Sequence, residues 1–297
     1  MRLLDPYACG GQDRKAQLHC HTTASDGQYA AEAVVARYRS CGFCFVALTD
    51  HDRLSDTTGL SDHEVCVVSG VEVTVPRPVR PLGPHVGCLA VSRVPRSRKP
   101  EDVFAEVEAA GGVAGLNHPS WTGNLWTARW RASEVRRLRG VRFVEVWNPH
   151  SDPDADTQVW VEAVRAHGPA HPVSPVAADD FHRDGQFGRA WTVVRTEAVD
   201  AGALVEALRR GSVYATTGPQ ARFAVRDGAV VVESDAAVVR FFDAQGQLRL
   251  EVARGAAEYE PGPADGFVRA ECLGRSAGRA WSAAFWVVDD ASGFSDP

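Results

Sequence analysis

The sequence predicts a parallel α/β protein followed by a smaller antiparallel β domain, on the basis of three observations. Strand-like and helix-like stretches alternate from about residue 16 to residue 218, which is typical of βαβ units. Polar side chains gather at or just after the ends of the strand-like runs, where α/β barrels build their active sites. From Ala221 onward, short strand-like runs separated by turns show no helical periodicity.

Composition excludes several classes of protein. The 297 residues suffice for one large and one small domain, and 44% hydrophobic with 24% charged residues is ordinary for a globular protein. A formal charge of −6 gives no overall attraction to nucleic acid or anionic lipid. Residues 1–7 lack the apolar core of a signal peptide, and no apolar run approaches a membrane span. We therefore expect a cytoplasmic protein without a membrane or stable nucleic-acid partner. Seven irregularly spaced cysteines argue against a disulfide framework.

The first elements follow from local patterns. Apolar residues recur at helical spacing in 28–40, and a helix there would end at Gly42. The continuous apolar run 43–48 predicts a parallel strand that is covered on both faces. Further strands are expected at 65–69, 71–75 and 85–91, and Pro100 opens a helix that runs to residue 110.

The same alternation continues in the second half of the α/β region. Strands are expected at 113–116, 142–147, 173–178 and 212–215, with helices at 133–139, 154–167 and 201–210. The tail predicts strands at 223–225, 230–232, 238–242, 248–252, 267–272 and 281–288. We place the two domains at residues 1–218 and 219–297, and we expect a packing or gating role for the second.

Two histidines and an aspartate stand close together in segment 18–27, LHCHTTASDG. If this segment is a strand, His19 and His21 point to the same side, because side chains alternate with period two. Asp26 follows in a Ser-Asp-Gly turn. Imidazole and carboxylate together suit a divalent transition metal such as Zn, Mn or Fe. The alternative is a strand with two unrelated histidines, one of them a hydrogen-bonded core residue.

Further histidines and carboxylates stand at the predicted strand ends. The residues of this kind are His19, His21, Asp26, His51, Glu72, His118, His150, Asp180 and His182. Nine such residues exceed the three or four ligands of one catalytic metal and would suffice for two or three ions. Asp180 and His182 repeat the period-two spacing, and a carboxylate such as Glu72 can bridge two ions.

Five motifs in this order resemble the polymerase and histidinol phosphatase (PHP) family. They are segment 18–27, TDHD at 49–52, GVE at 70–72, NHP at 117–119 with EVWNPH at 145–150, and DFH at 180–182. The resemblance covers about residues 16–218. It implies a distorted seven-fold β/α barrel and a metal-dependent hydrolase, in most members a phosphoesterase.

The resemblance also implies a division of the ligands among three metals. One ion would take His19, His21, Glu72 and Asp180, a second would share Glu72 and add His118 and His150, and a third would take Asp26, His51 and His182. Catalysis by a metal-bridging hydroxide would depend most directly on Glu72, Asp180, His51 and His182. Asp50 or Asp52 could orient His51, although both residues are equally compatible with capping a turn. Segment 209–219, RRGSVYATTGP, resembles a subgroup related to carbaryl hydrolase, which cleaves carbamate esters.

Four residues are candidates for contact with the substrate. His85 begins its predicted strand, so it is either substrate-facing or structural. Arg53 and Arg189 could clamp an anion, since guanidinium pairs well with phosphate, or form surface ion pairs. Trp121, with Trp126 and Trp130, predicts a pocket wall or a packed loop.

These observations predict a metal-dependent phosphoesterase that acts on a small phosphate ester or nucleotide with two or three Mn, Zn or Fe ions. A carboxylic or carbamate ester hydrolase that uses the same metals is the second possibility. The third is a non-catalytic, metal-stabilised accessory module, against which the nine filled ligand positions argue.

Overall fold

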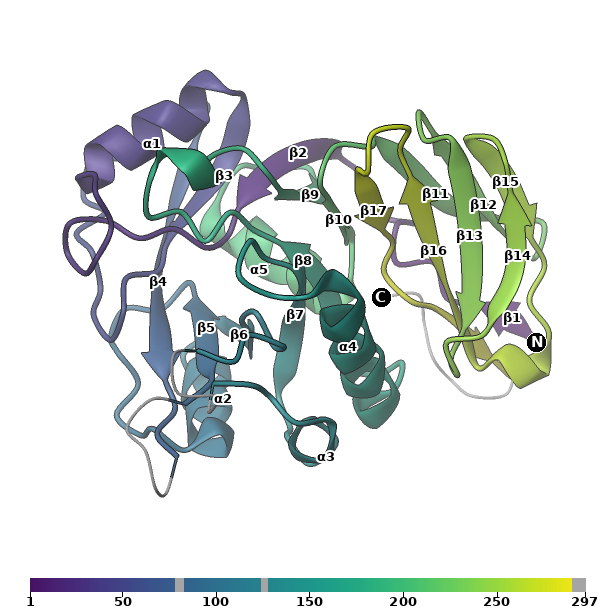
Figure 1. The fold of residues 1–297 in the computed structure, drawn as a ribbon, viewed down its shortest axis with the longest axis horizontal. Helices are drawn as coiled ribbons and strands as arrows, with labels where there is room; N and C mark the ends of the chain where they lie inside the picture. The colour runs from purple at the N-terminus through teal and green to yellow at the C-terminus, as the bar shows by residue number, and fades with distance from the viewer. Residues whose placement is uncertain (78–82, 124–127, 290–297) are drawn as a thin grey trace.

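The computed structural model describes residues 1–77, 83–123 and 128–289. Figure 1 shows a mixed α/β part and, beside it, a part that consists almost entirely of strands. No described helix is long and apolar enough to cross a membrane.

A mixed sheet forms the centre of the α/β part. Its strands are β2 (Gln12–Gln17), β3 (Phe43–Leu48), β4 (Cys66–Thr74), β5 (His85–Leu89), β6 (Val113–Leu116), β7 (Val141–Trp147), β8 (Ser174–Ala177), β9 (Trp191–Thr196) and β10 (Val213–Thr216). They lie in the order β10-β9-β2-β3-β4-β5-β6-β7-β8. β2, β3 and β4 pair in parallel, as do β6, β7 and β8. β5 runs antiparallel to both β4 and β6, and β9 runs antiparallel to β2.

The direction of β5 corrects the expectation of a wholly parallel sheet. Only residues 75–84 connect β4 to β5, which is too short for the helical crossover that parallel neighbours require. β4 is a single strand where two strands, 65–69 and 71–75, were predicted, because Gly70 has strand conformation and does not interrupt it. A Cβ atom there would lie 2.9 Å from the carbonyl oxygen of Cys88, so the glycine allows a close approach of the neighbouring strand.

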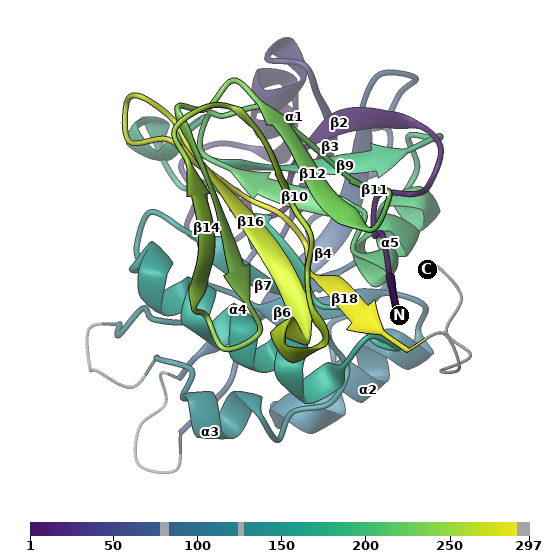
Figure 2. The same cartoon turned by 90° about the vertical axis from the view of Figure 1, so that its right-hand side faces the viewer.

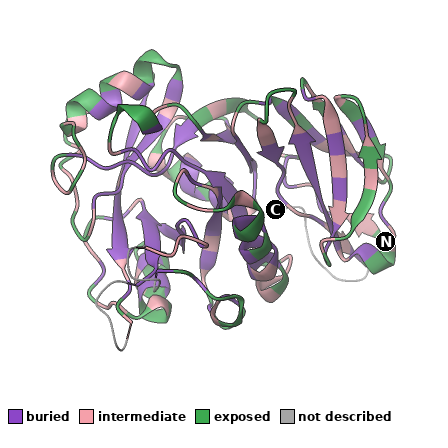
Figure 3. Ribbon diagram, viewed as in Figure 1, coloured by how far each residue is buried: buried purple, intermediate pink, exposed green. Residues whose placement is uncertain are grey.

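β9 and β8, which stand at opposite ends of the strand order β9-β2-β3-β4-β5-β6-β7-β8, lie next to each other. On β9, the Thr192 hydroxyl donates to the carbonyl oxygen of Ala177 at 3.1 Å and accepts from its N–H at 3.2 Å. Side chains from distant strands, such as Phe45, Phe143 and Val194, belong to one buried cluster. Figure 3 shows buried residues along these strands and exposed residues on the outer side of the first helix.

In the described part of the chain, five helices accompany the sheet: α1 (Ala31–Ser40), α2 (Pro100–Ala109), α3 (Ala132–Val135), α4 (Pro153–His167) and α5 (Ala201–Arg210). Asp152 caps α4 by accepting from two backbone N–H groups, and Gly211 ends α5 with a φ of 81°, which glycine adopts without strain. α3 is a single turn where a longer helix was expected. A short 3₁₀ turn, η1 (Asp184–Gln186), follows β8.

The strand-rich part contains two antiparallel groups of strands. One is β11 (Ala221–Arg226), β12 (Ala229–Ser234) and β15 (Ala256–Tyr259). The other is β13 (Val238–Asp243), β14 (Leu248–Val252), β16 (Phe267–Leu273), β17 (Arg279–Trp281), β18 (Phe285–Val288) and β1 (Arg2–Leu3), with the turn η2 (Pro263–Asp265). Figure 2 shows this part toward the viewer. β17 pairs with β10, so the larger sheet continues between the two parts. β1 pairs with β18, so the N-terminal residues lie with the strand-rich part.

Candidate metal centre

The two histidine motifs that follow β2 and β8 lie side by side. A bridge joins Cys20 to Phe181, and the N–H of His21 donates to the carbonyl oxygen of Phe181 at 2.9 Å. Because His19 and His21 flank Cys20 while Asp180 and His182 flank Phe181, this pairing brings all four side chains to one place. Cys20 itself is buried in the core on the other side.

The antiparallel direction of β5 brings His85 to the same rim. The parallel strands end at this rim, and an antiparallel strand begins there. His85 is the first residue of β5 and lies with its Nδ1 atom 2.9 Å from Oε1 of Glu72, while Nε2 of His118 lies 3.0 Å from the same oxygen. Glu72 is fully buried on β4. The sequence-based view that a strand-starting histidine stands apart from the ligands therefore assumed the wrong strand direction.

The first group of donors surrounds Nε2 of His19. Nε2 of His21 lies 3.0 Å away, Oδ1 of Asp180 3.2 Å and Oε1 of Glu72 3.3 Å. His21 is also 3.3 Å from Asp180 and 3.4 Å from Glu72. Ligand atoms about 2.0–2.2 Å from one ion at tetrahedral or octahedral corners lie about 2.8–3.6 Å apart. The two histidines thus lie at coordination-shell spacing from each other and from an oxygen of each carboxylate.

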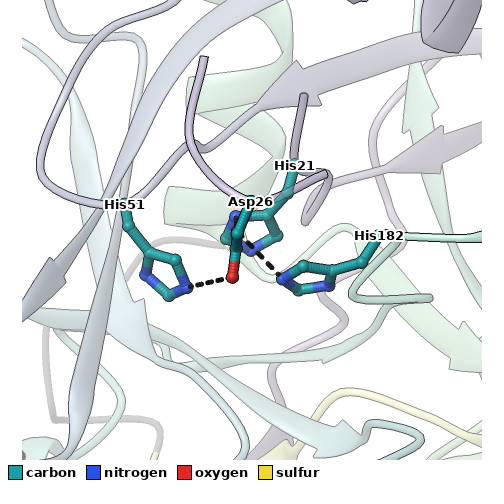
Figure 4. Close-up of side chains that lie close together, drawn as sticks. All are labelled: His21, Asp26, His51 and His182. Carbon is teal, nitrogen blue, oxygen red and sulfur yellow. Dashed lines mark ion pairs between the residues drawn. The ribbon is translucent and has the colours of Figure 1, made fainter. Parts of the chain in front are cut away.

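The second group lies around Asp26, as Figure 4 shows. Its Oδ1 atom is 3.3 Å from Nε2 of His182, and its Oδ2 atom is 3.7 Å from Nε2 of His51. Nδ1 of His182 lies 2.9 Å from the carbonyl oxygen of Asp180. Because that oxygen can only accept, Nδ1 carries a proton, and Nε2 is the nitrogen that faces Asp26 and could bind a metal.

Charges in the cluster are strongly coupled. Burial by itself would raise the pKa of Glu72 and of Asp180, but the neighbouring imidazoles hold both values well below the ordinary range. Burial lowers the pKa of His21, yet the nearby carboxylates of Asp180 and Glu72 outweigh it and raise the value to about 9. The carboxylates are therefore ionised, and positive charge is required beside them.

Several buried polar atoms of the cluster have no hydrogen-bond partner in the described part of the chain. They include Oε2 of Glu72 and Oδ1 of Asp180. An unsatisfied buried carboxylate oxygen costs free energy, and divalent cations supply the missing partner. Soft imidazole nitrogens with carboxylate oxygens are the donor set of Zn, Mn and Fe. The residues present therefore fit bound divalent metals.

A second layer of polar residues fixes the cluster. Glu145, which is 1% exposed, accepts from Nδ1 of His19 at 2.7 Å and from the backbone N–H of His118 at 2.7 Å. The Nδ2 amide of Asn148 donates to Glu145 at 2.9 Å, and that of Asn117 donates to Glu72 at 2.9 Å. The sequence analysis assigned no role to these three residues, although each stands at or next to a strand end.

Backbone strain also marks the site. His118 and Asp180 have φ values of 27° and 47°, in the left-handed region that non-glycine residues rarely adopt. Asp50 does not contact His51. Instead it accepts from the backbone N–H groups of Thr22 and Ser25, at 2.8 and 3.1 Å, and so holds the turn that presents Asp26.

His150 lies apart from the donor groups. Its Nε2 atom is 4.0 Å from Oδ2 of Asp180 and 2.8 Å from Nε2 of Gln186. Oε1 of Gln186 accepts from the backbone N–H groups of His182 and Arg183, at 2.8 and 3.1 Å, which fixes the amide orientation. Gln186 therefore donates to His150, whose Nε2 lone pair is occupied.

The two arginines expected to clamp a substrate are placed elsewhere. Arg53 donates to the carbonyl oxygen of Ala24 and does not line the pocket at the cluster. The guanidinium of Arg189 lies over the ring of Trp147, 5.7 Å from its centroid, and is also outside the pocket lining.

Of the two tryptophans that the structure describes in this segment, Trp121 lies in the pocket wall and Trp130 does not. Its ring contacts those of His118 and His85, with centroids 4.9 and 5.3 Å apart. Trp130 is a buried core residue whose indole N–H donates to the carbonyl oxygen of His85 at 3.1 Å. Trp126 lies outside the described residues.

A pocket of about 390 Å³ opens over the donor cluster. It is lined by Asp26, Gln28, His51, Glu72, His85, His118, Trp121, His150, Asp180, His182, Arg183 and Gln186. This volume is at the lower end of the range for small-molecule sites. Arg183 and Gln28 were not predicted from the sequence, because nothing local distinguishes them from surface residues.

No protein-family model and no curated protein matches the sequence. Among solved structures, a two-domain protein of Bacteroides vulgatus that contains a predicted PHP-like metal-dependent phosphoesterase matches 97% of this chain and 89% of its own, with 16% identity and a TM-score of 0.55. A candidate metal-dependent phosphoesterase of Bifidobacterium adolescentis matches 68% of this chain and 98% of its own (16% identity, TM-score 0.46). An amidohydrolase of Chromobacterium violaceum with bound sulfate matches 58% of this chain and 88% of its own (17% identity, TM-score 0.43). Across nearly its whole length, this chain therefore has a fold similar to that of a two-domain protein with a PHP-like domain.

Proposed function

We propose that this protein is a metal-dependent hydrolase of the PHP type, with a phosphate ester as its substrate. The observation that supports this most is the convergence of donors on His19 and His21, which lie 3.0 Å apart and each lie 3.2–3.4 Å from an oxygen of Glu72 and of Asp180. These donors lie at the base of a pocket of small-molecule size. Protein cores do not retain such a cluster for stability alone, because unpaired buried carboxylate oxygens are costly.

We assign the ligands to three neighbouring positions. The first ion would bind His19, His21, Glu72 and Asp180, and the third would bind Asp26, His51 and His182. For the second, the contacts favour Glu72, His118 and His85 over a set that contains His150, because both imidazoles lie within 3.0 Å of one Glu72 oxygen. Glu72 then belongs to two positions, as a bridging carboxylate.

Bound divalent ions would activate water and neutralise charge that develops on the ester oxygens. The chain's own residues prepare the site for this chemistry. Glu145 holds the Nδ1 proton of His19 and thereby leaves its Nε2 lone pair free, and the carbonyl of Asp180 does the same for His182. Trp121 covers His85 and His118 on the pocket side and limits access of bulk water to them.

We further propose that the strands from β2 to β9 form a distorted barrel, because Thr192 links β8 to β9. The domain boundary near residue 218 remains our proposal, with residues 1–7 packed on the second domain. A carbamate or carboxylic ester hydrolase is the second candidate function, since the same donors would activate water for either bond.

The proposal is tested with protein loaded with Mn or Zn. p-Nitrophenyl phosphate, its bis-ester, nucleotides and p-nitrophenyl acetate are the substrates. Phosphate ester hydrolysis that is lost on chelation and restored by metal is expected, and turnover of the acetate alone would favour the second candidate. Elemental analysis should give at least two ions per chain. His85→Ala should lose about one of them, whereas His150→Ala should lose none. The reverse pattern would contradict the ligand assignment.

A further inference from the structure

One cation in the pocket lining, Arg183, forms no ion pair with any residue that the structure describes. Arg183 lines the pocket, and among the residues that the structure describes no carboxylate pairs with its guanidinium. The neighbouring carboxylate of Asp184 accepts, through Oδ1, from the hydroxyl of Tyr29 at 2.8 Å and pairs with the guanidinium of Arg37. Arginine remains protonated at all physiological pH values. The pocket lining thus contains, beside the metal-binding residues, a guanidinium that no described carboxylate holds in an ion pair.

The backbone around Arg183 is fixed by a buried side chain. Gln186 is 6% exposed, and its Oε1 atom accepts from the N–H groups of both His182 and Arg183. Its amide N–H₂ group donates to His150, which also lines the pocket. One buried amide therefore locks the positions of the metal-facing His182, of Arg183 and of His150. The exposed side chain of Arg183 therefore extends from a fixed backbone position at the edge of the pocket.

We propose that Arg183 is a specificity-determining residue that binds an anionic oxygen of the substrate. Resting on the hydrolase function proposed above, this inference narrows the substrate class to phosphate esters and disfavours neutral carbamate and carboxylic esters. The planar guanidinium group forms bidentate hydrogen bonds with two phosphate oxygens, whereas a neutral ester has no negative charge for it to bind. His150, with its Nε2 lone pair occupied by Gln186, carries its proton on Nδ1 and is a second donor in the same pocket lining.

The test compares binding of inorganic phosphate to manganese-loaded protein by calorimetry. Arg183→Gln should weaken phosphate binding by about 10- to 100-fold, the loss expected for charge-assisted hydrogen bonds. Arg183→Lys should restore part of the affinity because it keeps the charge and loses the fork. Arg137→Gln, which removes an exposed arginine outside the pocket, should bind phosphate like the wild type. Metal content and thermal unfolding of all variants should match the wild type, which shows that the site is intact.

Kinetics separate this inference from the general function. Arg183→Gln should raise KM for p-nitrophenyl phosphate and leave any turnover of p-nitrophenyl acetate unchanged. Equal phosphate affinity in wild type and Arg183→Gln, or no phosphate binding by the metal-loaded wild type, would overturn the role of Arg183. Arg183-dependent phosphate binding in a protein that hydrolyses no phosphate ester would support the anion site and refute the proposed activity.

Discussion

Replacing Glu145 with glutamine tests whether the second layer controls the metal ligands. The carboxylate of Glu145 accepts three hydrogen bonds, from Nδ1 of His19, from the N–H of His118 and from Nδ2 of Asn148, at 2.7–2.9 Å. Glutamine has the same shape but only one accepting oxygen. If that oxygen faces His118 and Asn148, its N–H₂ group faces His19, whose proton must then move to Nε2. The Nε2 atom of His19 then has no lone pair with which to bind a metal.

The expected size of the effect follows from this geometry. In the opposite amide orientation two buried donors face an N–H₂ group, which costs about 1–3 kcal/mol for each unsatisfied group. Loss of an outer partner of a metal-binding histidine typically weakens metal affinity by about 10- to 100-fold. We therefore expect Glu145→Gln to weaken the Zn or Mn affinity of the first position by about that factor, measured by chelator competition.

The metal-dependent gain in stability should fall with the affinity. At one free-metal concentration well above both dissociation constants, a 100-fold weaker site stabilises the fold by about 2.7 kcal/mol less. Glu101→Gln, the same change at an exposed position of α2, is the matched control and should leave both quantities unchanged. A folded Glu145→Gln variant with metal affinity within twofold of the wild type would refute this account of His19.

Two predictions concern stability. Burial raises the pKa of Asp156 to about 6, compared with about 3.9 in an unfolded chain. The protonated side chain therefore favours the folded state below about pH 4, and this contribution to the free energy of unfolding, about 3 kcal/mol, is lost as the pH rises through 6. Asp156→Asn should therefore flatten the fall in unfolding free energy between pH 4 and 7 in urea titrations, and an unchanged slope would contradict the shift. Gly115→Ala should cost about 1–3 kcal/mol, because its Cβ would overlap the carbonyl oxygen and ring of Phe143. Gly185→Ala, with open space around it, is the control, and equal melting temperatures for the two variants would show that β6 and β7 relax freely.

Much of the fold is local in origin. The apolar run 43–48 and the amphipathic stretch 201–210 form β3 and α5 with the predicted bounds. β9 was not predicted, although segment 191–196, WTVVRT, is rich in residues that favour strands; it pairs with β2 and β10. The direction of β5 was also missed. A hydrophobic pattern shows which residues are buried and carries no record of which strands become neighbours.

The sequence by itself determined which side chains could hold metal, since imidazole and carboxylate chemistry is fixed by residue type and the spacing of His19 and His21 is local. Only the tertiary structure decided how these residues group. His85 reaches Glu72 because β5 is antiparallel, whereas Gln186 binds His150 and Arg183 faces the pocket because segments 148–150 and 182–186 meet in space. The grouping depends on contacts between segments far apart in the chain. No single segment determines the free energy of these contacts.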